Sequence, residues 1–138
     1  MKEVVKLMDY RPDIKIVDAT LRDGGLVNNF RFTDEFVKDL YQTNIKAGVD
    51  VMEFGYKADK EMFDVKDFGK WKFCDDEDIR AVVGDNNTDL KIAVMADVGR
   101  CNYKQDIKPR AESPVDVIRV ATYINQIPVS YTHLTLPT

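Results

Sequence analysis

Asp18-Ala-Thr-Leu-Arg-Asp-Gly-Gly25 is the stretch in which an apolar run ends in an Arg-Asp pair and two glycines. The apolar residues of 14–17 predict a buried strand, so we expect Arg22 and Asp23 where strand gives way to loop. Glycines adopt positive φ readily and let backbone N–H groups approach a bound anion. A carboxylate offers an oxygen ligand to a divalent cation, and a guanidinium can clamp a carboxylate or enolate. An isolated Arg-Asp pair is more often a solvated surface ion pair, so other stretches decide between the two interpretations.

A second charged residue lies in residues 49–55, a nearly continuous apolar run that predicts a strand buried on both faces of a parallel sheet. Glu53 is the exception within this run. A buried carboxylate needs a partner because an unpaired buried charge is costly, and Arg22 is the obvious candidate. The alternative is that Glu53 lies just past the end of the strand, in solvent.

The remaining pattern alternates helices and strands. Thr33 and Gly48 predict the N-cap and C-cap of a helix that ends near Ala47. Before this helix, the sequence predicts a loop over residues 26–32. After it, a short helix is predicted from Asp75 to about residue 83, followed by strands at 90–98 and 115–122. The connection between these two strands, at 101–113, is predicted to be short or irregular. Repeated strand and helix units with right-handed crossovers give an α/β fold with parallel strands whose carboxyl ends face one way.

Charged and amide side chains recur where these strands end. Asp97 ends the third strand, and Arg119 lies inside the fourth. Asn28 and Asn29 lie in the loop that follows the first strand and can hydrogen-bond a substrate, although amides cannot act as general bases. We therefore expect Arg22, Asp23, Glu53 and Asp97 to cluster. Asp97, Arg119 and the two asparagines are expected as weak substrate contacts.

Asp18-Ala-Thr-Leu-Arg-Asp-Gly and Val49-Asp-Val-Met-Glu-Phe-Gly55 resemble the first two strand motifs of the DRE-TIM metallolyases. This superfamily includes 3-hydroxy-3-methylglutaryl-CoA lyase, proteins with a pyruvate carboxyltransferase-type domain and, closest in pattern to this chain, 4-hydroxy-2-oxovalerate aldolase. The resemblance implies the N-terminal half of a (β/α)8 barrel, with about four parallel strands. It also implies that Asp23 ligates Mn2+ or Mg2+, that Arg22 steadies an enolate, and that Glu53 holds Arg22.

Two features depart from the family pattern. The aldolase branch has a histidine three residues after the metal aspartate, where this chain has Leu26, so the general base is unassigned. Two further metal ligands of the family come from a later His-x-His motif, which does not occur in residues 14–128. We expect an incomplete metal site and an inactive chain as given, with a parent that is a carbon-carbon lyase or aldolase acting on a pyruvate-like 2-oxo acid. The alternatives are an acyl-CoA-dependent Claisen synthase of the isopropylmalate or homocitrate type, and a catalytically inactive barrel that serves as a binding domain.

The chain divides into a lead-in segment at 1–13, a partial barrel at 14–128 and a tail at 129–138 that resembles translated sequencing adapter. His133, the only histidine, falls in this tail, so we interpret it as an artefact. A complete barrel typically needs about 250 residues, and this chain has 138. Open strand edges would favour pairing with another copy, so a homo-oligomer is possible on this pattern.

Composition narrows the class of protein. With 24 acidic and 20 basic residues, the net charge of −4 gives no electrostatic reason to expect nucleic acid or an anionic membrane as partner. The sequence contains no apolar run of membrane-spanning length and no signal peptide at its start, which predicts a cytoplasmic protein. Cys74 and Cys101 are too few for a zinc motif and are expected to be reduced thiols.

Overall fold

The computed structural model describes residues 11–127, which form a four-stranded parallel sheet in the order β1-β2-β3-β4. The strands are β1 (Val17–Asp18), β2 (Val51–Tyr56), β3 (Lys91–Asp97) and β4 (Val117–Ala121); the helices are α1 (Thr20–Asn28), α2 (Asp34–Ala47), α3 (Asp76–Val83) and α4 (Tyr103–Asp106), with 3-10 turns η1 (Lys70–Lys72) and η2 (Ile124–Gln126). Sequential strands pair in parallel, as in part of a (β/α)8 barrel, which confirms the predicted α/β class. The predicted tail and most of the lead-in segment lie outside the described residues.

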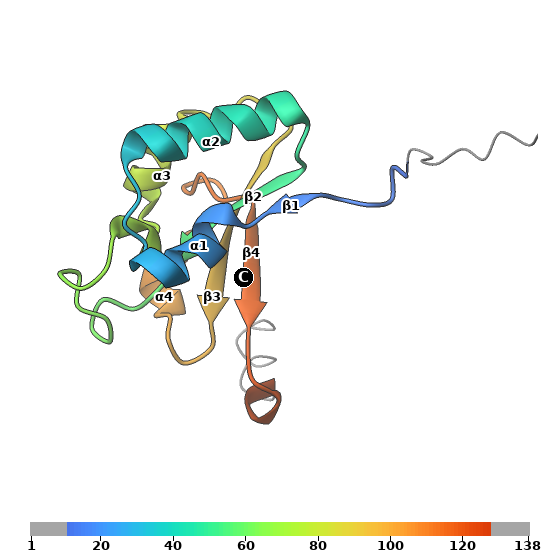
Figure 1. The fold of residues 1–138 in the computed structure, drawn as a ribbon. Helices are drawn as coiled ribbons and strands as arrows, with labels where there is room; N and C mark the ends of the chain where they lie inside the picture. Colours follow the sequence, from blue (N-terminus) through green and yellow to red (C-terminus); the bar gives the residue numbers. More distant parts are fainter. Residues whose placement is uncertain (1–10, 128–138) are drawn as a thin grey trace, which may run out of the picture.

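Helix α2 begins and ends as its sequence predicts. The Thr33 hydroxyl accepts a hydrogen bond from the Phe36 N–H at 3.2 Å, and Gly48 ends the helix with φ of 71°. Val37 and Tyr41 are buried on the face of α2 that turns toward the core. Figure 1 shows α2 and α3 lying next to each other as the helical layer beside the sheet.

The first strand is shorter and more exposed than its apolar sequence predicts. Only Val17–Asp18 pairs with β2, and Ile14, Ile16 and Val17 are each more than half exposed. The prediction of a buried strand is wrong here because β1 lies at the edge of the described sheet, where it pairs with β2 on one side only (Figure 1). The third and fourth strands are confirmed within two residues of their predicted ends.

The Arg-Asp-Gly-Gly stretch is helical, which corrects the predicted strand-to-loop junction. Arg22 and Asp23 lie in the first half of α1, and Gly24 and Gly25 have no positive φ. A Cβ on Gly25 would lie 2.1 Å from an atom of the buried Phe30 ring, so close packing against this ring requires a glycine. The predicted loop therefore starts only after Asn28, the last residue of α1, and Asn29 caps the helix with φ of 55°.

The core lies between the sheet and the helical layer. Trp71 is fully buried, and its ring packs against Phe54 of β2 at 5.4 Å between centroids. The segment between β2 and α3 carries both Trp71 and Phe73, and both side chains are buried. No helix within residues 11–127 is long and apolar enough to cross a membrane.

Candidate functional site

Glu53 lies in the middle of β2 and is 1% exposed, although its neighbours in the strand are apolar. Its Oε2 accepts a hydrogen bond from the Arg22 Nε–H at 3.0 Å, which confirms the predicted pairing and excludes the solvent-exposed alternative. A carboxylate buried this deeply is stabilised only when it is paired and hydrogen-bonded. The position of Glu53 in β2 therefore fixes the Arg22 guanidinium beside the sheet.

Arg119 of β4 also binds the Glu53 carboxylate. Its Nε–H donates to Glu53 Oε1 at 2.8 Å, and its Nη2 donates to Oε2 at 2.5 Å. This two-bond contact is the geometry in which a guanidinium and a carboxylate interact most strongly. Arg119 was expected as a weak substrate contact, and the sequence reasoning missed its role as a second partner of Glu53.

The strand register explains why Glu53 and Arg119 meet. Glu53 is paired in register with Ala93 of β3, and Ala93 is paired with Val117 of β4. In a barrel of eight strands and shear 8, each strand is displaced by about one residue from its neighbour. From β2 to β4 the displacement adds up to about two residues. The residue of β4 at the level of Glu53 is therefore two positions after Val117, which is Arg119. Side chains of alternate strands fill one interior layer of such a barrel. The two-residue offset between β2 and β4 was therefore the sequence signal that could have predicted the contact between Glu53 and Arg119.

Asp23 extends the cluster toward solvent. Its Oδ1 lies 2.7 Å from Arg22 Nη1, and its side chain is 60% exposed, compared with 16% for Arg22. Partial burial lowers the pKa of Arg22, but hydrogen bonds to Tyr56 and Glu53 and the nearby carboxylate charges outweigh this effect and raise the pKa above its ordinary value. The hydrogen bonds to Glu53 likewise raise the pKa of Arg119. Both guanidiniums therefore remain charged.

A cavity of about 240 Å³ opens at the carboxyl ends of β2, β3 and β4. Its lining includes Tyr56, Asp97, Arg100, Thr122, Tyr123 and Gln126. Tyr56 belongs to this lining and is the last residue of β2, the strand that also carries Glu53. Asp97 lines this cavity at the end of β3, so its expected place in one cluster with Arg22, Asp23 and Glu53 stays a prediction, whereas Asn28 and Asn29 do not line this cavity.

The described residues do not complete a metal site. Within residues 11–127, no three His, Cys, Asp or Glu side chains gather closely enough to hold a metal ion. Asp23 offers a single exposed carboxylate, and the exposed apolar side chain of Leu26 cannot ligate a metal ion. A divalent cation at a catalytic site usually has more than one protein ligand. The role of Asp23 as a metal ligand therefore stays a prediction.

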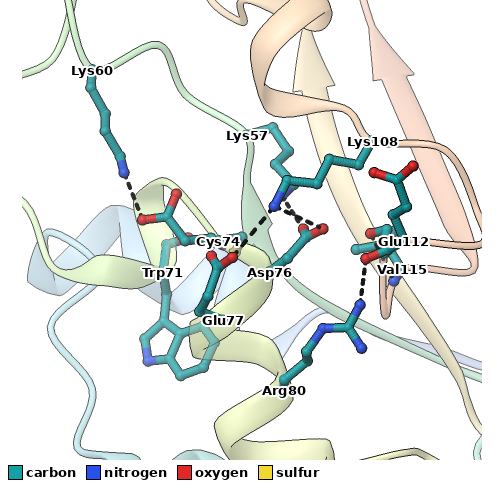
Figure 2. Close-up of polar contacts among 12 residues, drawn as sticks. Lys57, Lys60, Trp71, Cys74, Asp76, Glu77, Arg80, Lys108, Glu112 and Val115 are labelled. Carbon is teal, nitrogen blue, oxygen red and sulfur yellow. Dashed lines mark hydrogen bonds and ion pairs between the residues drawn. The ribbon is translucent and has the colours of Figure 1, made fainter.

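A second charged cluster connects the end of β2 to the start of α3 (Figure 2). Lys57 follows β2 directly, and its ammonium group donates to Asp76 Oδ1 at 2.7 Å; both side chains are buried. Lys108 lies near the same helix start, 3.4 Å from Glu77 Oε1. The sequence reasoning did not identify this pair, although a lysine directly after a strand and an acidic first helical turn were both visible. The contact holds the strand end that carries Tyr56.

No protein-family model matches this chain, and no solved structure matches it either. Among curated proteins, 4-hydroxy-2-oxovalerate aldolase 6 of Rhodococcus jostii is 31% identical over 125 residues, which cover 91% of this chain and 34% of that aldolase. The 4-hydroxy-2-oxovalerate aldolase of Pelotomaculum thermopropionicum is 29% identical over 126 residues, or 36% of its length, and that of Roseiflexus castenholzii is 28% identical over 119 residues, or 34% of its length. The chain spans about a third of the length of these relatives. Over this part, the chain is therefore similar to the 4-hydroxy-2-oxovalerate aldolases.

Proposed function

We propose that this chain carries the enolate-binding part of an aldolase that cleaves 4-hydroxy-2-oxo acids into a pyruvate-like 2-oxo acid and an aldehyde. The cluster in which buried Glu53 holds both Arg22 and Arg119 beside the strand-end cavity is the observation that carries this proposal. The names of the curated relatives support the same chemistry and suggest 4-hydroxy-2-oxovalerate as the substrate. Active sites of (β/α)8 barrels form at this end of the strands.

Arg22 is the residue that binds the developing enolate in this proposal. Carbon-carbon cleavage next to a 2-oxo group leaves negative charge on the oxo oxygen, and a fixed cation stabilises that charge more in the transition state than in the substrate. Glu53 holds the guanidinium through its Nε–H, so no reorientation is needed when charge develops. Arg119 acts as a positioning residue because it fixes Glu53 from the side of β4.

Asp23 is proposed as one carboxylate ligand of Mn2+ or Mg2+, because it is exposed and adjoins Arg22. The remaining ligands would have to come from outside residues 11–127, where no complete ligand set is found. When bound, such an ion would polarise the 2-oxo group of the substrate.

The proposal is tested with a polypeptide of the relatives' full length that contains this chain. Pyruvate release from 4-hydroxy-2-oxovalerate is followed with Mn2+ or Mg2+ by a lactate dehydrogenase coupled assay. We expect turnover by the wild type, and a loss in kcat/KM of about 100-fold or more in Arg22→Lys, since lysine cannot reproduce the planar contacts of arginine.

Arg80→Lys is the matched control, because Arg80 lies on α3 and bonds the Glu112 carbonyl away from the cavity. Its kcat/KM is expected to equal that of the wild type. Absence of pyruvate release with either metal, or an Arg22→Lys variant as active as the control, would show that the proposed function is wrong.

A further inference from the structure

The strand-end cavity extends from the level of Arg119 toward the carboxyl ends of the strands. Met95, which lines the cavity, is paired in register with Arg119, and Ala121, two residues further along β4, lines it as well. Two residues of a parallel strand span about 6.6 Å. A substrate held by Arg22 beside Glu53 can therefore extend into this cavity with the atoms that lie several bonds from its 2-oxo group.

Two cationic residues are held side by side next to the end of β2. The Ala58 N–H donates to the Lys72 carbonyl at 3.2 Å, and the Asp59 N–H donates to the Arg100 carbonyl at 2.9 Å. Arg100 lines the cavity, and the Lys72 ammonium group lies 4.5 Å from the ring centroid of Tyr56, another residue of the lining. Backbone contacts thus bring two positive side chains, distant in sequence, to one side of the cavity.

The charges around the cavity do not cancel. In the part of the chain that the structure describes, neither Lys72 nor Arg100 forms an ion pair, and Asp97 is the acidic residue of the lining. Burial lowers the pKa of Lys72, while Asp97 raises it and Arg100 lowers it, which agrees with three charges that lie near one another. Two cations and one anion leave one positive charge in excess, which favours an anionic ligand.

Packing alone does not require a charge at Lys72. Its ammonium group lies within 5.5 Å of the centroids of four aromatic rings, those of Phe30, Tyr56, Phe63 and Phe68. Partial burial of an ammonium group without a carboxylate partner costs free energy, which the contacts with the rings offset in part. A methionine would fill the same space and also makes favourable contacts with aromatic rings. What the lysine adds is positive potential at the cavity wall.

We propose that Arg100 and Lys72 form a subsite for a second carboxylate group of the substrate, an inference that rests on the proposed aldolase function. The substrate is then a 4-hydroxy-2-oxo diacid, in which a carboxylate takes the place of the methyl group of 4-hydroxy-2-oxovalerate. This carboxylate is three bonds from the 2-oxo carbon, whereas the C1 carboxylate is bonded to it directly, so the former is the group that extends into the cavity. Arg100 hydrogen-bonds the carboxylate, and Lys72 stabilises it through the local potential.

The chemistry of cleavage is the same for such a diacid. As the bond between C3 and C4 breaks, its electron pair passes to the enolate, and the 4-hydroxyl group loses its proton and becomes the aldehyde of glyoxylate. Protonation of C3 then gives pyruvate. The subsite therefore determines which aldehyde is released and leaves the bond-breaking step unchanged.

The test compares two substrates that differ only in the group attached to C4. A polypeptide of the relatives' full length that contains this chain is incubated with Mg2+ and either 4-hydroxy-2-oxoglutarate or 4-hydroxy-2-oxovalerate, and pyruvate formation is followed by proton NMR. We expect the wild type to prefer the diacid by about 10-fold or more in kcat/KM, and Arg100→Gln to lower this ratio by about 10-fold or more. Lys72→Met should lower the ratio by about 3-fold or more, since it acts without a direct hydrogen bond.

The matched controls are Arg80→Gln and Lys66→Met, which remove the same charges at exposed positions outside the cavity lining and should keep the wild-type ratio. Near-identical thermal melts of Arg100→Gln, Lys72→Met and the wild type show that a changed ratio reports recognition and not folding.

The outcomes separate this inference from the proposed function. A wild type without preference for the diacid, or an Arg100→Gln variant that keeps the wild-type ratio, overturns the subsite and leaves the aldolase proposal intact. An equal loss of kcat/KM for both substrates in Arg100→Gln would assign Arg100 to the shared C1 carboxylate and likewise overturn the inference. A wild type that cleaves neither substrate overturns the aldolase proposal and the subsite with it.

Discussion

Replacing Glu53 with glutamine tests whether the buried carboxylate organises this end of the sheet. The substitution keeps the shape of the side chain and removes its charge. In the native chain, Glu53 is 1% exposed and accepts three hydrogen bonds from the guanidiniums of Arg22 and Arg119. After the change, both guanidiniums would face a neutral amide that also presents an N–H group to them.

The expected loss in free energy of unfolding depends on how deeply each arginine partner of Glu53 is buried. Removal of one partner from a buried ion pair lowers the free energy of unfolding by about 3–5 kcal/mol. The Arg22 side chain is 16% exposed, so its pair with Glu53 is little screened and should show most of this cost. The Arg119 side chain is 49% exposed, so its pair is closer to a surface pair, which contributes about 0–1 kcal/mol. We expect Glu53→Gln to cost about 3–5 kcal/mol and Arg119→Gln about 1 kcal/mol or less.

Urea unfolding followed by fluorescence measures these differences directly, because Trp71 is the only tryptophan and is fully buried. With a slope of about 1.5 kcal/mol/M, Glu53→Gln should lower the midpoint by about 2–3 M and Arg119→Gln by less than about 1 M. Glu112→Gln, at an exposed position, is the control and should leave the midpoint unchanged. Equal midpoints for Glu53→Gln and Arg119→Gln would refute the argument that burial decides the cost.

Three further predictions concern packing, burial and pH. In thermal melts, Gly24→Ala should stabilise the chain by up to about 1 kcal/mol, because a Cβ at this position meets only ordinary contacts. Gly25→Ala should destabilise the chain by about 1–3 kcal/mol, because a Cβ there would overlap the Phe30 ring. Stabilisation by both substitutions would contradict the packing described for α1. In urea, Asp76→Ala should cost about 3–5 kcal/mol by leaving Lys57 unpaired, and replacing both with leucine and methionine should recover most of this loss. Burial raises the pKa of the Cys74 thiol, so above about pH 8.5 the folded chain keeps a proton that the unfolded chain loses. The contribution of Cys74 to the free energy of unfolding should therefore fall by about 1.4 kcal/mol for each pH unit above about 8.5. Unfolding in urea at pH 8 and 10 measures this slope, and a Cys74→Ala variant with the same slope would exclude the thiol as its cause.

The parts of the fold that follow from local sequence were predicted well. Helix α2 has a capping threonine before it, a glycine after it and apolar residues at helical spacing between, so local preference and burial indicate the same structure. The strands β3 and β4 were likewise visible as apolar runs, and both form within the expected ranges. Agreement between propensity and tertiary packing makes such elements predictable.

Helix α1 shows why local preference failed elsewhere. Two consecutive glycines argue against a helix, since each costs about 1 kcal/mol relative to alanine in a helix interior. Tertiary contacts outweigh this cost, because Leu21 is fully buried and Gly25 lets the Phe30 ring pack against the helix. Neither contact could be inferred from the Arg-Asp-Gly-Gly stretch itself.

The site likewise has contacts that follow from local sequence and contacts that depend on tertiary structure. A glutamate in an apolar strand needs a cation, so the contact between Glu53 and Arg22 was predictable from two short motifs. Arg119 lies 66 positions from Glu53, and its contact depends on the register of three strands. The cavity likewise depends on strands far apart in the sequence, because Tyr56, Asp97 and Thr122 all line it.

The geometry of the charged cluster is set by strands that are all present in this chain. Glu53 and Arg119 reach each other across β3, so the backbone pairing of β2, β3 and β4 determines their separation. Ile118 of β4 is exposed, and the Arg119 side chain is 49% exposed, so the cluster still faces water on the side of β4. Covering that side in a longer chain would lower the local dielectric constant and strengthen each ion pair without moving the atoms. The contacts that place Arg22 and Arg119 around Glu53 are thus all formed within residues 11–127.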